Sequence, residues 1–399
     1  MSPAPTSEFV LVANTRMPAR RAQALQVAQA CAAFARAGRA STLVVADRRP
    51  EPLPAGVDLW DFYAVPRGAR PELVRVPVID LIDRVPVALQ YLPARLEEQS
   101  FARNASRLVL ERFPRALVLA REIEVARRLT RAGKREVLLE LHRVPGGSLR
   151  RRRLLDAARR VLGVVAISGG VREDLVLLGV EPERILVEHD ALEAGRFASP
   201  LTREAARASL GLLPTDTVVV YTGGLMPWKG VDVLVDAARE LPALRFVIAG
   251  GTEADVARLR ERARGLGHVR IDGFQAPERV GLYLAAADLG VVPNLSQPAI
   301  SARYTSPLKV FESFAAGLPL VASDLPSLRE LLTADVDALL VAPDDPAALA
   351  RGIARLAADR DLRESFRARG LARAKDCTWD ARAARILDWA GARLGRATP

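Results

Sequence analysis

Short apolar runs alternate along the chain with longer segments in which apolar positions recur every three or four residues. The first run is Phe9–Ala13, a periodic segment follows over residues 22–37, and the next run covers residues 41–46. Short apolar runs are typical of buried parallel strands, and a recurrence of three to four is typical of amphipathic helices. The pattern therefore predicts a β-α-β unit and a parallel sheet.

The alternation restarts after a polar, proline-containing segment at residues 190–202. Clear strands are predicted at residues 218–221, 245–249, 269–272 and 289–292, each followed by a helical segment. We therefore predict an α/β fold with two Rossmann-like doubly wound domains, over residues 1–195 and 196–376. A last helix, within residues 377–399, is expected to pack back towards the N-terminal domain. Because ligands of such sheets bind beyond the carboxyl ends of the strands, we expect the site in a cleft that the two domains face.

The proline-rich residues 50–100 give a weaker pattern, with one strand expected near residues 73–79. Cys31, Cys377 and the three histidines are scattered, which predicts neither a disulfide framework nor a metal site, and no cofactor is expected. No apolar stretch approaches the ~20 residues of a membrane span, and no targeting signal is visible at the start. The expected location is cytoplasmic.

The positive charge is concentrated in the first half of the chain. The net charge is +11, and residues 1–190 hold 31 of the 58 Lys and Arg but 22 of the 47 Asp and Glu. A run of arginines, Arg150–Arg153, lies on a predicted helix. It is either a solvated face or a surface for an anionic acceptor, such as a lipid-linked phosphate sugar, or for the inner face of the membrane. Nucleic-acid binding is disfavoured, because aromatics are 5% of the chain and do not interleave with the basic residues.

The segment Ser306–Glu312 has the pattern of an anion-binding helix start. Ser306 is expected as the N-cap and Pro307 as the first helical residue. Lys309 would weaken the bare helix, because a cation opposes the dipole there, so its presence favours a bound anion such as a diphosphate. Glu312 lies one turn further, where a carboxylate can accept hydrogen bonds from ribose hydroxyls. The alternative is an ordinary capped helix with surface charges.

A second segment, Tyr221–Gly230, follows a buried strand and precedes a helix. The paired glycines Gly223 and Gly224 let the backbone approach a ligand closely, and Lys229 is placed to reach a diphosphate. The spacing matches neither the dinucleotide fingerprint nor a Walker A loop, and a tight strand-to-helix turn is the alternative.

Together these segments resemble the retaining GT-B glycosyltransferases of family 4. The stretches that carry the resemblance are YTGGLMPWKGVDVLVDAA, LRFVIAGG and SPLKVFESFAAGLPLVASDLPSLREL, in the same order and spacing as in that family. The resemblance is strong over residues 200–340 and weaker in the N-terminal half, where LLELHRVPG and ILVEHDALEAGRF match.

The resemblance implies roles for individual residues. Lys229 would neutralise the donor diphosphate, Glu312 would hold the nucleotide ribose, and His142 would lie near the transferred sugar. The implied donor-binding residues are Gly223, Gly224, Lys229, Gly250, Gly251, Ser306, Pro307, Leu308, Lys309 and Glu312. Asn14, Arg16, Arg20 and Arg21 would lie on the acceptor side.

The chain departs from the family pattern at three positions. Tyr304 stands where the first glutamate of the paired motif is usual, Gly224 where an arginine is common, and Ala191 where a glycine is usual. The resemblance implies transfer of a sugar from a nucleotide diphosphate donor to a glycan, lipid-linked or small-molecule acceptor, with retention and without a metal. The alternatives are a non-catalytic binder of nucleotide sugars or polyanions, and a nucleotide-sugar epimerase.

Overall fold

The computed structural model describes residues 7–86, 89–197 and 201–396. Its contacts divide the chain into two compact units. Unit 1 consists of Met1–Ile167, Val171–His189 and Trp379–Pro399, and unit 2 of Ser168–Gly170 and Asp190–Thr378. The divisions thus fall near residues 189 and 378, a few residues from the boundaries expected at 195 and 376.

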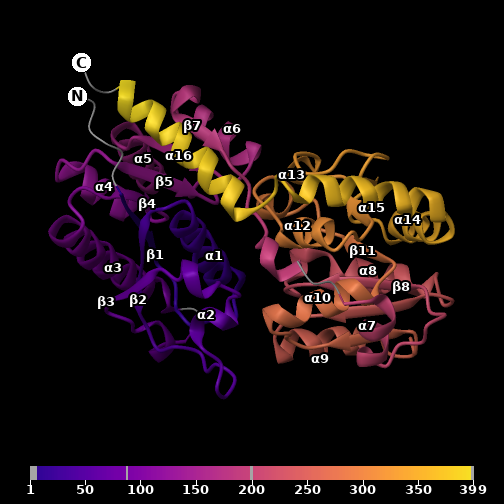
Figure 1. Cartoon of the computed structure of the whole chain (residues 1–399). Coiled ribbons are helices and arrows are strands. Elements are labelled where there is room, and N and C mark those ends of the chain that lie inside the picture. The colour runs from indigo at the N-terminus through magenta and orange to yellow at the C-terminus, as the bar shows by residue number, and fades with distance from the viewer. Residues whose placement is uncertain (1–6, 87–88, 198–200, 397–399) are drawn as a thin grey trace. The chain divides into compact units, whose positions relative to one another are not determined.

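Unit 1 is built on a seven-stranded parallel sheet with the order β3-β2-β1-β4-β5-β6-β7 (Figure 1). The strands are β1 (Glu8–Ala13), β2 (Ala40–Asp47), β3 (Glu72–Pro77), β4 (Leu117–Ala120), β5 (Val137–Leu141), β6 (Gly163–Ala166) and β7 (Ile185–Val187). The helices are α1 (Ala22–Arg36), α2 (Leu59–Phe62), α3 (Tyr91–Arg112), α4 (Ile123–Arg131), α5 (Ser148–Arg160), α6 (Gly169–Leu177) and α16 (Trp379–Arg396). Since the order reverses beside β1, loops after β1 and β4 diverge at a topological switch point.

Unit 2 contains a six-stranded parallel sheet with the order β10-β9-β8-β11-β12-β13. The strands are β8 (Val218–Thr222), β9 (Arg245–Ala249), β10 (Val269–Asp272), β11 (Leu289–Val292), β12 (Leu320–Ser323) and β13 (Ala338–Val341). The helices are α7 (Arg203–Leu210), α8 (Val231–Arg239), α9 (Glu253–Arg262), α10 (Pro277–Ala286), α11 (Ala299–Ala302), α12 (Leu308–Ala315), α13 (Pro326–Arg329), α14 (Pro346–Ala358) and α15 (Arg360–Ala374). The predicted α/β class with doubly wound parallel sheets is confirmed.

The C-terminal helix α16 belongs to unit 1, although almost two hundred residues of unit 2 separate it from the rest of that unit. The indole Nε1 of Trp379 donates to Gln29 Oε1 of α1 at 3.0 Å. Gly163 of β6 leaves room for the Trp389 ring, because a Cβ at that position would lie 2.1 Å from the indole. Trp379 at the start of α16 and Trp389 in its second half thus hold the helix against this sheet and its helices.

Several elements were not predicted, among them α3 and β13. The 22-residue helix α3 begins in the proline-rich segment, and its buried face carries Glu97 and Ser106 among apolar residues, so the apolar period is weak. Strand β13 is a four-residue run, too short to separate from the helices around it. In the part of the chain that the structure describes, no helix is long and apolar enough to cross a membrane.

Candidate functional site

The glycine pairs of unit 2 bring two loops into backbone contact beyond the ends of β8 and β9. Gly223 and Gly250 have φ angles of 133° and 131°, and the Gly223 N–H donates to Ala249 O at 2.9 Å. A Cβ on Gly250 would lie 2.0 Å from the Gly223 carbonyl oxygen. No side chain fits there, so the glycines keep the backbone of these loops closely packed at the carboxyl edge of the sheet.

Lys309 points into the space beside this loop. Its amine lies 3.5 Å from the centre of the Tyr221 ring, and a Cβ on Gly223 would be 3.4 Å from it. The side chain is buried, and the amine has no hydrogen-bond partner. Burial first, and then the charge of Lys229, holds the pKa of Lys309 well below its usual value, while Glu312 raises it. A buried amine without a partner is costly, and a bound anion would remove that cost.

Lys229 is the second amine of this cluster. It lies 4.0 Å from the centre of the Trp228 ring, just before α8. Burial lowers its pKa to about 8, and Asp190 opposes the shift. The pKa of Lys309 is lowered by the charge of Lys229, so the two amines are close enough to repel each other. The unit therefore holds two coupled cations that an anion of two or more charges would satisfy.

The start of α12 differs from the prediction in one respect. The N-cap is Pro307, not Ser306, and the helix begins at Leu308. The Ser306 hydroxyl instead accepts the backbone N–H of Asp190 at 2.8 Å. Pro307 has an extended ψ of 116° and no hydroxyl or carboxylate, so no side chain caps the helix. The first N–H groups of α12 therefore remain available to a ligand.

Glu312 is held by Arg196, which the sequence did not single out. The Arg196 Nη1 lies 2.8 Å from Glu312 Oε1, and both side chains are nearly buried. A second guanidinium nitrogen donates to Pro277 O at 2.5 Å. Because one oxygen of the carboxylate is bound by the guanidinium, the orientation of Glu312 is fixed and its other oxygen stays available.

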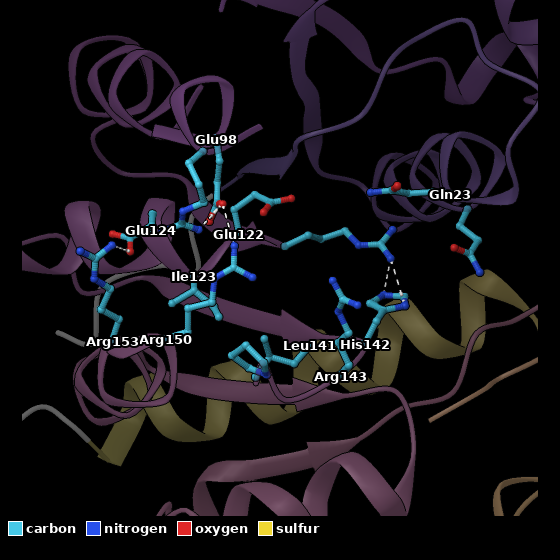
Figure 2. A pocket seen from close by; sticks show the side chains of 14 residues that line it. Gln23, Glu98, Glu122, Ile123, Glu124, Leu141, His142, Arg143, Arg150 and Arg153 are labelled. Carbon is cyan, nitrogen blue, oxygen red and sulfur yellow. Dashed lines mark hydrogen bonds and ion pairs between the residues drawn. The ribbon is translucent and has the colours of Figure 1, made fainter. Parts of the chain in front are cut away.

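The predicted residue His142 lies in unit 1, at the end of β5. Its Nε2 is 2.9 Å from Glu140 Oε1, and its ring also contacts Arg121. Glu140 is buried between Arg121 at 3.1 Å and Arg382 at 2.7 Å. Burial alone would raise the pKa of Glu140, but Arg382, Arg121 and His142 hold it well below its usual value. His142 is thus fixed at the wall of a cavity of about 470 Å³ (Figure 2).

The four residues expected on the acceptor side do not line that cavity. The Asn14 side chain donates to Glu97 Oε2 at 2.8 Å, and Arg16 pairs with Asp83 at 3.0 Å. The Arg20 N–H donates to Glu51, and Arg21 is the N-cap of α1. Asn14 does reach the cavity indirectly, because its N–H donates to the lining residue Glu122 at 3.2 Å.

Tyr304 lies in the loop between α11 and α12 and is partly buried. The guanidinium of Arg303 is 5.8 Å from the centre of its ring. Among the residues that the structure describes, no group of three or more His, Cys, Asp and Glu side chains is arranged to hold a metal ion.

Part of the chain is similar in sequence to known glycosyltransferases. Residues 216–359 match the family model "Glycosyl transferases group 1", and this segment contains both glycine loops and the start of α12. The D-inositol 3-phosphate glycosyltransferase of Nocardia farcinica is 32% identical over 253 residues, which are 57% of this chain and 54% of that protein. That of Rhodococcus erythropolis is 36% identical over 165 residues, 38% of this chain and 36% of the relative. The chain spans about half the length of the curated relatives it matches, or less.

Solved structures show the same fold over nearly the whole chain. HepE of Anabaena in complex with UDP superimposes with a TM-score of 0.74 and 18% identity, over 96% of this chain and all of that one. Sucrose-phosphate synthase of Thermosynechococcus elongatus gives a TM-score of 0.75 and 20% identity, over 98% of this chain and all of that one. The predicted GT-B fold is confirmed, and the matched sequences are those of glycosyltransferases.

Three residues of the site escaped sequence analysis because their role depends on contacts between distant segments. Arg196 reaches Glu312 across 116 positions, and the Asp190 N–H reaches Ser306 across the same separation. Tyr221 carries no chemistry in itself, but its hydroxyl donates to Gly224 O at 2.6 Å and its ring lies under Lys309. The stretch ILVEHDALEAGRF, which resembles the family weakly, contains Asp190 and Arg196 and could have drawn attention to both.

The two lysines predict a pH dependence of anion binding. The affinity for inorganic diphosphate is expected to fall as the pH rises through about 8, because Lys229 loses its charge there. Calorimetry at several pH values measures this. The Lys229→Gln variant is the control, since the ratio of its affinity to that of the wild type cancels the titration of the probe. A ratio that stays constant between pH 7 and pH 9 would contradict the assignment.

Proposed function

We propose that this protein is a glycosyltransferase that moves a sugar from a nucleotide diphosphate donor, bound by unit 2, to an acceptor with retention of configuration and without a catalytic metal. The observation that carries the proposal is the pair of coupled lysines, Lys229 and Lys309, beside the glycine loops and the uncapped start of α12. We also propose a cytoplasmic location with peripheral contact at the membrane, on the basic first half of the chain.

A donor diphosphate suits this cluster in charge and in geometry. Its negative charge would restore full protonation of both amines, and the free N–H groups of α12 would add the positive end of the helix dipole. When the bond to the sugar breaks, negative charge grows on the departing diphosphate. Lys229 and Lys309 would stabilise that charge without a metal ion. In HepE the bound molecules are UDP and UDP-glucose, which makes UDP-sugars the first donors to test.

Glu312 would bind the donor ribose through its hydroxyls. The carboxylate lies one turn into α12, and Arg196 holds its Oε1 at 2.8 Å. A carboxylate oriented in this way accepts hydrogen bonds from two neighbouring hydroxyls at a low entropic cost. We therefore assign Arg196 as a positioning residue that acts through Glu312.

The acceptor is proposed to bind unit 1. The relatives named D-inositol 3-phosphate glycosyltransferases suggest a small phosphorylated polyol as one candidate. His142 would face the transferred sugar, with its ring fixed by Glu140 and Arg121. We assign His142 to hydrogen bonding with a sugar hydroxyl.

The donor is identified with a panel of UDP-, GDP-, ADP- and dTDP-sugars, measured by calorimetry and by slow hydrolysis. One donor is expected to bind selectively, and the first sugar released should have the anomeric configuration of the donor. Lys229→Ala should lower turnover by about 10²–10³-fold, because it removes a cation that stabilises the leaving group. Circular dichroism checks that the variant folds.

The outcomes of this panel separate the candidate functions. Activity of the folded Lys229→Ala variant within a few-fold of wild type would remove the role of this lysine. Selective binding without any turnover of donor would indicate a non-catalytic binder, and epimerised donor would indicate an epimerase.

The role of Arg196 predicts a loss of ribose discrimination. Wild type should bind the nucleoside diphosphate selected by the panel about tenfold more tightly than its 2′-deoxy or 3′-deoxy analogue. Glu312→Gln should reduce this ratio, and Arg196→Met should reduce it as well. Because both substitutions act on the same carboxylate, the double variant should reduce the ratio of affinities no further than Glu312→Gln alone. An Arg196→Met variant that binds more weakly but keeps the full ratio would show a merely structural role.

His142→Ala should lower turnover of the selected donor by about tenfold or more and raise its dissociation constant by less, because the nucleotide and diphosphate of the donor are proposed to bind the lysines of unit 2. Steady-state kinetics measure the turnover, and calorimetry measures the dissociation constant of the donor. Normal turnover in the variant would exclude a role for His142 in transfer.

A further inference from the structure

A charged side chain lies in the middle of the sheet of unit 1. Strand β5 lies between β4 and β6 and is buried along its whole length, yet its fourth residue is Glu140, which is 4% exposed. A buried carboxylate is costly unless hydrogen bonds and opposite charges satisfy it. The partners of its two oxygens therefore indicate its role.

The two oxygens of Glu140 have different partners. Oε1 lies 2.9 Å from His142 Nε2 and 3.1 Å from Arg121 Nε. Glu140 and His142 are two residues apart at the end of one strand, so both side chains leave the same face of the sheet. Oε2 accepts a hydrogen bond from Arg382 Nη2 at 2.7 Å. One oxygen thus holds the histidine of the cavity wall, and the other is held by a residue of the C-terminal helix.

Arg382 is a fully buried arginine in the first turn of α16. Its side chain is 2% exposed, its Nε donates to His189 O at 2.8 Å, and its guanidinium carbon lies 5.5 Å from the centre of the Trp379 ring. These contacts fix the direction in which the guanidinium faces Glu140. Well-packed apolar residues can often replace a buried ion pair without loss of stability, so stability alone does not account for this pair.

The charge of Arg382 keeps Glu140 ionised. Burial would raise the pKa of Glu140, and Arg382 first, then Arg121 and His142, hold it well below its usual value. An ionised carboxylate has no proton to donate, so its hydrogen bond with His142 needs a proton on Nε2. In the neutral ring, Nδ1 is then the nitrogen that can accept a hydrogen bond from a hydroxyl.

Arg121 competes for the same ring nitrogen. Its Nη2 contacts Nε2 and lies 3.3 Å from Nδ1 (Figure 2). A guanidinium can only donate, so its contact with Nε2 favours the opposite tautomer, which carries the proton on Nδ1. An ionised Glu140 favours the proton on Nε2, whereas a protonated Glu140 would leave Nε2 to accept from Arg121. The tautomer of His142 therefore depends on the charge of Glu140.

We propose that Arg382 is a positioning residue of the transfer reaction, which acts through Glu140 to fix the tautomer and the orientation of His142. This inference rests on the proposed function, in which His142 binds a hydroxyl of the transferred sugar. With Nε2 bound to Glu140, His142 accepts the hydrogen bond of that hydroxyl through Nδ1. The C-terminal helix thereby supports the site, although Arg382 lies 242 positions from Glu140 in the sequence.

Nitrogen-15 NMR of the histidine rings tests the tautomer directly. The chain has three histidines, so the signals of His142 are assigned by their loss in His142→Gln. In the wild type we expect the proton on Nε2. In Arg382→Met part of the population should carry it on Nδ1. That part should grow as the pH is lowered from 8.5 to 7, because loss of the guanidinium raises the pKa of Glu140.

Turnover of the selected donor gives the second readout. Arg382→Met should lower turnover by about tenfold at pH 7, because the histidine loses an oriented hydrogen bond. The ratio of its turnover to that of the wild type should recover as the pH rises to 8.5, since Glu140 regains its charge. This ratio cancels the titration of groups that both proteins share. A role limited to stability would lower turnover by the same factor at every pH.

Arg385→Met is the matched control. Arg385 lies three residues further along α16, and its guanidinium is 2.8 Å from each oxygen of Glu188, whose side chain is nearly buried. The variant removes the same charge from the same helix, but Glu140 keeps its partners. The tautomer of His142 and the pH profile of turnover should therefore match those of the wild type.

Circular dichroism checks the fold of each variant. If Arg382→Met does not fold, Arg382→Gln takes its place, because glutamine keeps a donor for the carboxylate without the charge. A tautomer that shifts together with a pH-dependent loss of turnover supports the proposal. The proposal is overturned if folded variants without the charge at position 382 keep the wild-type tautomer, or if Arg385→Met shifts it equally.

The two readouts separate this inference from the proposed function. A shifted tautomer with normal turnover would show that Arg382 fixes the ring, and the failure would then lie with the role of His142 in transfer. Lower turnover with an unchanged tautomer would assign Arg382 to the stability of α16 and remove its positioning role. The NMR result stands even if no nucleotide sugar binds unit 2.

Discussion

Parallel strands deliver all their carboxyl ends, and the helices that follow them, to one edge of the sheet. Both units of this protein depend on that constraint. In unit 2 the ends of β8 and β9 meet as glycine loops, with Lys229 nearby and Lys309 packed against Tyr221. In unit 1 the ends of β1, β4 and β5 release three helices whose starts surround one cavity. The sites follow from the topology, and the side chains decide which charge each one attracts.

The two sites collect positive charge in different ways. In unit 2 the cations are few, Lys309 is buried and Lys229 is half-buried, so their charge is unstable without a ligand, and the pKa of Lys229 is lowered accordingly. In unit 1 the cations are arginines, which stay charged at any relevant pH and share too few carboxylates. A lysine site exchanges protons when it binds an anion, whereas an arginine site does not. The cavity of unit 1 also holds a titrating group, because burial raises the pKa of its lining residue Glu122 to about 7.

The sequence predicted best those elements whose secondary structure follows from the local pattern of apolar and polar residues. Buried strands such as β8 and β9, and helix α8, follow directly from short apolar runs and helical periodicity. Glycine pairs and the Ser306–Glu312 segment marked the unit 2 cluster, because their chemistry is contained in a few consecutive residues. Helix α3 was missed because Glu97 and Ser106 occupy its inward face. The N-cap at Ser306 was wrong because the hydroxyl serves Asp190, which lies far away in the sequence.

The same reasoning explains why Arg196 and Arg143 could not be chosen from sequence. The chain holds 58 lysines and arginines, almost all arginines, so an individual arginine carries little information. What separates these two is their partners: Arg196 is nearly buried on Glu312, and Arg143 has no partner among the described residues. The buried pair of Arg196 and Glu312 leaves one carboxylate oxygen available, so Arg196 is suited to orienting Glu312. Arg143 lines a charged cavity without a partner among the described residues, so its guanidinium is suited to binding an anion. Partner and burial therefore assign different tasks to chemically identical side chains.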